Sequence, residues 1–300
     1  MNQPVIEILN LTKIYRGGHT PAVSNLSLTV PRGEIFGFLG ANGAGKTTTI
    51  KILLGLQFAT AGEVRVLGGD PASRGVRRQV GYLPERPYLQ DTMGFDEFLN
   101  FHRDLFGRPL KDEKFLSNAD LAALVGLTNF GRKSLKQFSK GMLQRAAIAQ
   151  ALINDPRLLI LDEPMSGLDP VGRREVRDLI LRLRDRGKTI FLSSHILSDI
   201  EQISQRIAFL EKGILKREGL VQELIKQEDS AFELIFAGEN LLSIFPESRA
   251  EPGNRARITC ANAGDARRLI ERGWAAGAVL INCGQRHQNL EDVLFGSEAK

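Results

Sequence analysis

Residues 40–47, Gly-Ala-Asn-Gly-Ala-Gly-Lys-Thr, form the segment of the chain best suited to hold a phosphate group. Glycines let the backbone curl so that several N–H groups point at one anion, and a helix that begins at such a loop directs its positive end there. The G-x-x-x-x-G-K-[ST] spacing is complete, and it stands between an apolar run and a helical pattern, as this motif requires. The sequence therefore predicts a phosphate-binding loop for a nucleotide.

Individual residues of this loop are assigned to parts of the nucleotide. Lys46 is expected to place its charge on the β- and γ-phosphates, and the Thr47 hydroxyl to bind Mg²⁺. The loop alone does not decide among kinases, GTPases and motor ATPases, which share it. The other predicted nucleotide ligands in the loop and the first turn of the helix are Gly40, Asn42, Gly43, Ala44, Gly45 and Thr48.

Further polar residues follow in a fixed order along the chain. Asp162 and Glu163 end the apolar run 158–161, and His195 follows Ser194 at the end of the apolar run 189–193. Ser166-Gly-Leu-Asp169 lies between them, and Phe138-Ser-Lys-Gly-Met142 precedes Leu-Gln-Arg145 ahead of all of them. An apolar strand that delivers carboxylates suits a hard cation such as Mg²⁺.

Together with the phosphate loop, these segments resemble the ATP-binding domain of ABC transporters over about residues 5–215. Residues 138–142 are similar to the family's signature sequence, 158–163 to its Walker B strand, and 166–169 to its D-loop, which contains Asp169. The resemblance implies that Asp162 holds the Mg²⁺ shell, that Glu163 activates the attacking water, and that His195 contacts the γ-phosphate. It also implies that Tyr15 stacks on adenine, although plain packing remains an alternative for this side chain.

The signature residues Ser139, Lys140, Gly141 and Met142 head a predicted helix, where a hydroxyl, backbone N–H groups and the helix dipole together make an anion site. In the resembled family this site faces the γ-phosphate held by a partner subunit. The resemblance therefore implies a head-to-tail homodimer around two ATP molecules, with Mg²⁺, and separate polytopic membrane permease subunits. It places the chain in the cytoplasm, peripheral on the inner face of the membrane.

Two positions depart from the usual pattern of the family. The Q-loop glutamine is replaced by Glu85, expected as a Mg²⁺ ligand, with Gln90 as the alternative residue for that position. Lys140 replaces the first glycine of the signature. Both variants resemble type-2 ABC exporters, and this resemblance implies export.

The elements that position these residues can be read from hydrophobic periodicity. Short strands are predicted at residues 6–9, 26–30, 34–39, 63–66, 78–83, 158–161 and 189–193. Helices are predicted at 47–56, within 93–127, at 139–153 and at 173–186. After residue 219 the pattern predicts a connecting helix at 221–227, strands at 232–236, 257–260 and 278–281, and a helix at 265–272 ended by Gly273.

These patterns predict an α/β P-loop NTPase fold. Alternating strands and helices give a RecA-like parallel sheet; the family implies an N-terminal antiparallel β subdomain and an inserted helical subdomain at about 86–153. The predicted ATPase domain is 1–218. The predicted connecting helix and small α+β accessory domain, 219–300, resemble the C-terminal extension of exporter ATPases, with residues 289–295 as an amphipathic final segment.

Composition limits the alternatives without deciding among them. No run of 18 apolar residues predicts a membrane span, the start resembles no secretory signal, and two cysteines provide no zinc or disulfide pattern. Residues 219–300 hold 9 Lys and Arg against 12 Asp and Glu, a net charge of −3. Because the whole chain carries +5, the first 218 residues carry +8. That surplus keeps open a soluble ABC ATPase acting on nucleic acid or the ribosome, although no nucleic-acid partner is expected. A protein that binds ATP without hydrolysis is disfavoured by the complete set of catalytic residues.

Overall fold

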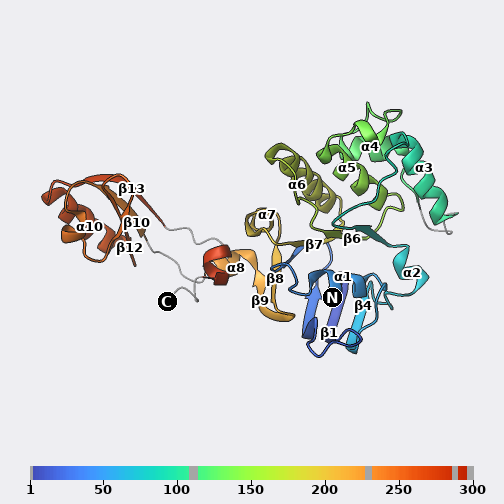
Figure 1. Ribbon diagram of the computed structural model, residues 1–300, viewed down its shortest axis with the longest axis horizontal. Helices are drawn as coiled ribbons and strands as arrows, with labels where there is room; N and C mark the ends of the chain where they lie inside the picture. The colour runs from blue at the N-terminus through green and yellow to red at the C-terminus, as the bar shows by residue number, and fades with distance from the viewer. Residues whose placement is uncertain (1–2, 108–113, 227–231, 286–289, 296–300) are drawn as a thin grey trace. The chain divides into compact units, whose positions relative to one another are not determined.

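The computed structural model describes residues 3–107, 114–226, 232–285 and 290–295. Contacts divide the chain into two units, Met1–Val221 and Gln222–Lys300, each with its own hydrophobic core. The first unit is built on a six-stranded sheet in the order β5-β6-β7-β3-β8-β9, drawn in Figure 1. Its strands are β3 (Ile35–Leu39), β5 (Val80–Leu83), β6 (Leu158–Asp162), β7 (Thr189–Ser194), β8 (Arg206–Glu211) and β9 (Ile214–Leu220).

All neighbours in this sheet are parallel except β8 and β9, which form an antiparallel pair. Every residue of β3, β6 and β7 is buried, because both faces of a central parallel sheet are covered. This burial explains why these strands are continuous apolar runs in the sequence. The register sets Asp162 of β6 beside Ser193 of β7, so the polar ends of the two strands meet.

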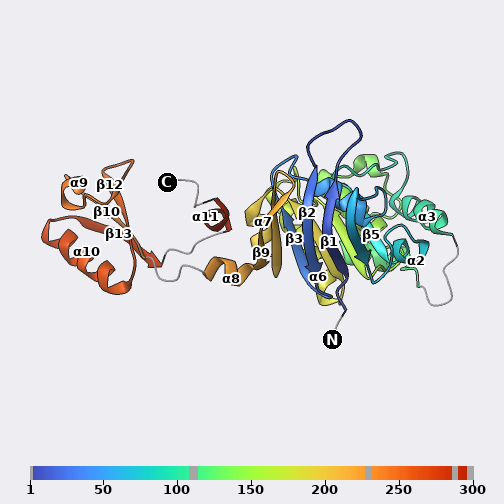
Figure 2. The same ribbon diagram turned by 90° about the horizontal axis from the view of Figure 1, so that it is seen from below.

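A three-stranded antiparallel sheet in the order β2-β1-β4 covers one face of the first unit. It consists of β1 (Ile6–Lys13), β2 (Val23–Val30) and β4 (Ala61–Val66). The inner side chains of this sheet share one core with helix α1 (Lys46–Leu53) and with Phe36, Phe38 and Phe191 of the central sheet. Figure 2 shows β1 and β2 alongside the central strands.

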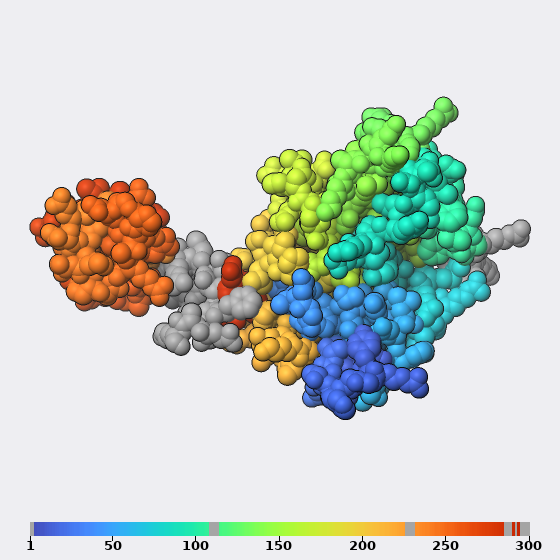
Figure 3. Space-filling view, in the orientation of Figure 1, coloured from blue at the N-terminus to red at the C-terminus, as the bar shows by residue number. Residues whose placement is uncertain are grey.

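Helices form the rest of the first unit. The helical lobe contains α3 (Phe95–Phe106), α4 (Asn118–Val125), the 3₁₀ turn Leu135–Gln137 and α5 (Lys140–Ala151). In the space-filling view this lobe, in teal and green, lies on the opposite side of the unit from the dark blue N-terminal strands (Figure 3). Besides α1, the helices outside the lobe are α2 (Arg74–Arg77), α6 (Pro170–Asp185) and α7 (Leu197–Glu201), and the last two contact β7.

The second unit holds a four-stranded antiparallel sheet in the order β11-β12-β10-β13. Its strands are β10 (Phe232–Ala237), β11 (Arg249–Glu251), β12 (Arg255–Cys260) and β13 (Val279–Gln285). Buried apolar side chains of the sheet pack with Ala266 of α10 (Ala263–Ala275) and Leu241 of α9 (Leu241–Ile244). The remaining helices are α8 (Val221–Lys226) and α11 (Leu290–Phe295).

The predicted fold class is confirmed: a mostly parallel sheet, an N-terminal antiparallel sheet, an inserted helical lobe and a small α+β unit are all present. Three strands, β8, β9 and β11, were not predicted. The prediction that the first helix extends to Leu56 was wrong, because Gly55 adopts a positive φ of 63° after α1 ends. Gln227 and Asn289, at the ends of two predicted segments, lie outside the described residues. Within the described ranges, no helix is long and apolar enough to cross a membrane.

The prediction that Gly273 ends a helix was also wrong, since α10 continues through Gly273 to Ala275. A Cβ atom on Gly273 would lie 2.5 Å from Cε1 of Phe236, a buried residue of β10. The glycine therefore allows the helix to approach the sheet closely. The turn out of the helix is made at Gly277, which has a φ of 78°.

Candidate active site

The phosphate loop connects the end of β3 to the start of α1. Gly45, which caps α1, has a φ of 104°, a value that residues with a side chain rarely adopt. A Cβ on this residue would also lie 2.5 Å from the carbonyl oxygen of Ala22. The loop conformation therefore requires glycine at this position, and it directs the first turn of α1 toward a cleft.

This cleft has a volume of about 380 Å³. It brings together most of the residues predicted to bind nucleotide or Mg²⁺, and it adds Ala22 and Ala41. Gly40 and Ala44 belong to the same loop but are not among the lining residues, and Ala44 is buried. The lining residues are Ala22, Ala41, Asn42, Gly43, Gly45, Lys46, Thr47, Thr48, Glu85 and Glu163.

A chain of charged contacts links Lys46, Glu163 and His195. The Lys46 ammonium donates to the Gly40 carbonyl oxygen at 2.6 Å and lies 3.3 Å from Glu163 Oε1. The other oxygen, Oε2, lies 2.8 Å from Nδ1 of His195, within hydrogen-bond distance. Lys46 and Glu163 are buried, whereas 39% of the His195 side chain is exposed. The carboxylate is thus held between a cation and an imidazole at the cleft.

Glu163 has an unusual backbone conformation for a residue other than glycine, with a φ of 51°. Such a conformation costs on the order of 1–3 kcal/mol and persists only where the surroundings fix it. Here the Glu163 N–H donates to both the Oγ and the carbonyl oxygen of Ser193, at 3.0 and 3.2 Å. The strand β7 therefore holds the turn that directs the carboxylate back to the loop.

Asp162, the last residue of β6, is almost completely buried. Ser193 Oγ donates to its Oδ1, and Thr47 Oγ1 donates to its Oδ2 at 3.4 Å. Burial raises the pKa of Asp162, and the charges of Glu163 and Glu85 act in the same direction. Burial, followed by the charge of Asp162, raises the pKa of nearby Tyr82 to about 12.

Two residues are candidates for the Q-loop position, and they differ in their relation to the cleft. Glu85 lines the cleft, whereas Gln90 is not among the lining residues. The predicted adenine-stacking residue, Tyr15, also lies outside this lining set. Its ring is 43% exposed, and its hydroxyl contacts Thr48 Oγ1 at 3.1 Å and donates to Gln57 Oε1 at 3.0 Å. Tyr15 therefore lies beside the first turn of α1, partly exposed, with the Lys13 ammonium over its ring at 5.4 Å from the centroid.

The signature residues lie at a different place on the first unit. Ser139 caps α5 by accepting from the Met142 N–H at 3.3 Å, and both Ser139 and Lys140 are exposed. Asp169 caps the neighbouring helix α6 through the Gly172 N–H at 3.0 Å. The two helix starts are close, because a Cβ on Gly141 would lie 3.6 Å from Gly172 Cα. None of the four signature residues lines the phosphate-loop cleft of the same chain.

Two contacts near the site were not predicted from sequence. Buried Gln144 of α5 donates to the carbonyl oxygen of Pro164 at 2.8 Å, which ties the signature helix to the residue after Glu163. Ser193 contacts both Asp162 and Glu163. A signal for Ser193 did exist, because a hydroxyl at the end of an otherwise apolar strand is unusual next to a strand that ends in two carboxylates.

The donor set around the cleft fits Mg²⁺ that binds together with phosphates. The Thr47 hydroxyl and the carboxylates of Asp162, Glu163 and Glu85 are hard oxygen donors. Oε1 of Glu163 is buried and accepts no hydrogen bond within the part of the chain that the structure describes. That same part contains no cluster of three His, Cys, Asp or Glu side chains able to hold a metal alone. This arrangement suits Mg²⁺, which takes one or two protein ligands and completes its shell with phosphates and water.

Comparisons with known proteins agree with this geometry. A sequence profile of the family described as "ABC transporter" matches residues 23–166. An uncharacterised ABC transporter ATP-binding protein of Synechocystis is 46% identical over 241 residues, 78% of this chain and 68% of that protein. The bacitracin transport ATP-binding protein BcrA of Bacillus licheniformis is 37% identical over 246 residues, 81% of this chain and 78% of that protein.

Solved structures give the same result. The ATP-binding subunit of an ABC transporter is similar, with a TM-score of 0.63 and 30% identity, over 74% of this chain and 92% of that chain. An ATP-binding cassette solved as a dimer in a post-hydrolysis state with ADP and Pi is similar with a TM-score of 0.63 and 25% identity. That match covers 72% of this chain and 98% of the other.

Proposed function

This chain belongs to the ABC transporter family of ATP-binding proteins, and we propose that two copies of it drive an exporter by closing around two ATP molecules. It is the ATP-binding, ATP-hydrolysing subunit of such a transporter. The export direction is supported by its similarity to ATP-binding proteins for bacitracin and lantibiotic transport. In this proposal it works in the cytoplasm, bound to membrane subunits on the inner face of the membrane.

The phosphate loop and its neighbours bind the nucleotide. Lys46 reaches the β- and γ-phosphates from the first turn of α1, where the helix dipole and the loop N–H groups add positive potential. Asn42, Gly43 and Thr48 line the same cleft, which supports their roles around the phosphates. The partly exposed ring of Tyr15, held beside Thr48 by its hydroxyl, provides the stacking surface for adenine on the face that Lys13 does not cover.

Mg²⁺ would be held by Thr47 and Asp162, with Glu85 on the cleft wall as a further oxygen ligand. When bound, it supplies charge neutralisation at the β- and γ-phosphates. A carboxylate at position 85 adds negative charge that a glutamine would not, and the buried Lys46 ammonium offsets part of it. The effect of this exchange is local to the γ-phosphate end of the cleft.

Glu163 and His195 carry out the hydrolytic step. Glu163 orients the attacking water and accepts its proton, since its carboxylate is fixed at the cleft by a strained turn and two polar neighbours. His195 holds that carboxylate through Nδ1 and is exposed enough to reach the γ-phosphate. Ordering the water in this way replaces solvent reorganisation that the uncatalysed reaction requires.

One observation carries the proposal of a dimer: Ser139 and Lys140 are exposed at the start of α5, and none of the four signature residues lines the cleft of its own chain. An exposed helix start with a capping serine and a lysine is suited to bind an anion. This helix start is nevertheless not part of the cleft formed by the phosphate loop and Glu163 of the same chain. A second copy placed head-to-tail would bring this helix start, together with Asp169, onto the γ-phosphate. Each ATP is then shared between two chains.

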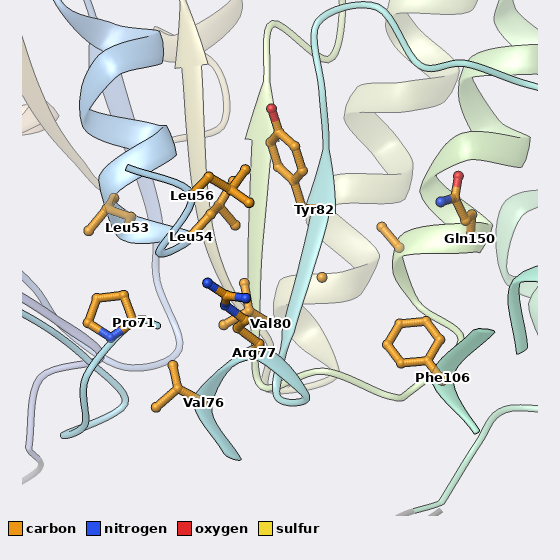
Figure 4. A pocket seen from close by; sticks show the side chains of 12 residues that line it. Leu53, Leu54, Leu56, Pro71, Val76, Arg77, Val80, Tyr82, Phe106 and Gln150 are labelled. Carbon is orange, nitrogen blue, oxygen red and sulfur yellow. The ribbon is translucent and has the colours of Figure 1, made fainter. Parts of the chain in front are cut away.

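The membrane subunits dock in an apolar groove between the central sheet and the helical lobe. This groove has a volume of about 300 Å³, and Figure 4 shows leucines and Pro71 on one side, β5 with Tyr82 in the middle, and Phe106 and Gln150 on the other. Apolar side chains line most of it, with Arg77 at its centre. Glu85 follows the last residue of β5 by two positions, so the segment that leaves the groove leads directly to the nucleotide cleft.

The test of this proposal uses paired substitutions at Ser139 in a Glu163→Gln background. Glu163→Gln is expected to bind ATP without hydrolysis and to accumulate as a dimer, measured by light scattering after gel filtration. Asp and Asn both cap helices as well as serine does, so Ser139→Asp adds only a charge and Ser139→Asn adds none. We expect Ser139→Asp to bind ATP as a monomer, because its carboxylate would repel the partner's γ-phosphate, and Ser139→Asn to dimerise. Equal dimerisation of the two variants would contradict the proposed interface.

The second candidate, an ATPase acting on nucleic acid or the ribosome, has no specific observation in its favour. The two candidates can still be separated by one purification. Co-purification with a polytopic membrane protein from solubilised membranes supports transport, whereas retention on a nucleic-acid column with a steep salt dependence supports the other function.

A further inference from the structure

Ser193 is a polar residue that bridges the two carboxylate-bearing positions of the site. It lies near the end of β7, is completely buried, and stands in register with Asp162 on β6. Its hydroxyl donates to Asp162 Oδ1 and accepts from the Glu163 N–H at 3.0 Å. A hydroxyl has one donor and two acceptor sites, so Ser193 Oγ can act as a donor to Asp162 and as an acceptor from Glu163 at the same time.

The hydrogen bond to Oδ1 determines how Asp162 presents its second oxygen. With Oδ1 engaged by Ser193, Oδ2 faces the phosphate loop and lies 3.4 Å from Thr47 Oγ1. The N–H contact acts on the next residue, because Glu163 has a left-handed backbone whose N–H is fixed by the Oγ and carbonyl of Ser193. The Ser193 side chain thus fixes the carboxylate of Asp162 and also the backbone turn at Glu163.

We propose that Ser193 is a positioning residue for the ATPase reaction, whose hydroxyl fixes Asp162 Oδ2 toward the metal-binding side of the cleft and sets the backbone turn of Glu163. This inference rests on the proposed function, in which Asp162 and Thr47 hold Mg²⁺ with ATP. Ser193 itself touches no substrate, and it acts through the two residues beside it. Partners that orient a metal ligand typically change metal affinity or activity by about 10- to 100-fold when removed.

A purely structural role explains the surroundings of Ser193 less well. The residues before it in β7, Ile190, Phe191 and Leu192, are buried and apolar. A serine in such a strand loses hydration and gains packing area only slightly, so an apolar residue would serve the core better. The two side-chain hydrogen bonds of Ser193 both go to the Walker B pair, and neither caps a helix.

The first experiment measures the affinity for a fluorescent ATP analogue in Mg²⁺ and in excess EDTA. Ser193→Ala is expected to lower the affinity in Mg²⁺ by about tenfold and to leave the affinity in EDTA within about twofold, because only the metal-dependent part of binding needs Asp162 Oδ2 in place. Ser193→Thr retains the hydroxyl and is expected to restore most of the Mg²⁺-dependent gain. A Ser193→Ala protein that keeps the full ratio of the two affinities would overturn the proposal.

Thr189→Val is the matched control, since it also removes a buried hydroxyl from β7 that accepts a backbone N–H, here from Gly33. Thr189 lies at the opposite end of β7 from the cleft. The variant therefore shows the effect of destabilising this strand while Asp162 and Glu163 keep their hydrogen bonds to Ser193. We expect it to change neither affinity. A drop in the Mg²⁺-dependent ratio equal to that of Ser193→Ala would show that general destabilisation of β7 explains the effect.

A double-mutant cycle with Asp162→Asn then tests whether Ser193 acts through Asp162. If it does, Ser193→Ala changes the Mg²⁺-dependent ratio far less in the Asp162→Asn background than in the wild type. Equal effects in the two backgrounds would contradict the proposal. Failure of the proposed magnesium site is seen separately, because in that case the wild-type protein binds the ATP analogue with the same affinity in both buffers.

Discussion

At the residue scale, the nucleotide cleft concentrates features that a stable fold normally avoids. Asp162 and Glu163 are buried carboxylates, and Glu163 has a left-handed backbone without being a glycine. Lys46 is buried as well, beside the Glu163 carboxylate. Departures of this kind cluster where a protein binds and reacts, and other parts of the fold offset their cost. Asp162 offers a direct measure of that cost.

We predict that Asp162→Asn raises the melting temperature of the first unit near pH 7.5, and that this advantage shrinks as the pH falls. Burial raises the folded-state pKa of Asp162 above its unfolded value, so its stabilising contribution is complete at low pH and is lost as the pH rises through the folded pKa. Asparagine has no such charge and can still accept the Ser193 hydrogen bond. Circular dichroism melts of both proteins from pH 4.5 to 8 provide the measurement. A stability difference that is constant over this range would mean that ionisation of Asp162 costs the fold nothing.

Residue identities also decided how much of the site could be predicted. Lys46 and Thr47 belong to one contiguous motif with a fixed spacing, so their place beside α1 followed from local sequence. Glu85 and Glu163 are 78 positions apart, and their meeting at one cleft depends on parallel strands that the alternating pattern did indicate. Ser193 left a local signal as a hydroxyl in a mostly apolar run, but its partners follow from the register of β7 against β6, which no local pattern specifies.

At the element scale, prediction succeeded where burial leaves a strong periodic signal. The central strands β3, β6 and β7 are fully buried and were found as apolar runs. The strand β9 was missed because it lies at the sheet edge, with charged and exposed residues that give no clear alternation. The helix α10 was ended too early because Gly273 was interpreted from its local preference, whereas contact with β10 explains it.

We predict that Gly273→Ala destabilises the second unit although alanine favours helices. The gain in helix propensity is about 1 kcal/mol, while a methyl group 2.5 Å from the Phe236 ring requires repacking that costs about 1–3 kcal/mol. Hydrogen exchange of the α10 amides as a function of denaturant follows unfolding of this unit, because Trp274 of this helix is 62% exposed and its fluorescence would change little. Gly284→Ala is the control, because nothing lies within 4 Å of the added Cβ and its φ is not positive. Equal denaturation midpoints for the two variants would disprove the packing explanation.

At the scale of the whole molecule, the two units differ in how they are stabilised. The phenylalanines Phe36, Phe38 and Phe191 belong to a core formed entirely by residues of the first unit. Phe236 and Phe245 stack in a smaller core formed entirely by residues of the second. The residues that line the nucleotide cleft and the proposed docking groove, and those that form the signature helix α5, are all numbered below 200. The residues that line the nucleotide cleft therefore all belong to the first unit.

We predict that a fragment of residues 1–226, which keeps α8 whole, folds and binds ATP with an affinity within about threefold of the complete chain, a difference under 1 kcal/mol. Lys46→Ala in the same fragment is the control, and it should lose binding because the cation at the phosphates is gone. Differential scanning calorimetry gives a second readout: the complete chain should show two transitions, and the fragment only the one that ATP shifts to higher temperature. A fragment that is unfolded, or that binds ATP more than about tenfold more weakly, would show that the ATP-binding unit requires residues beyond 226.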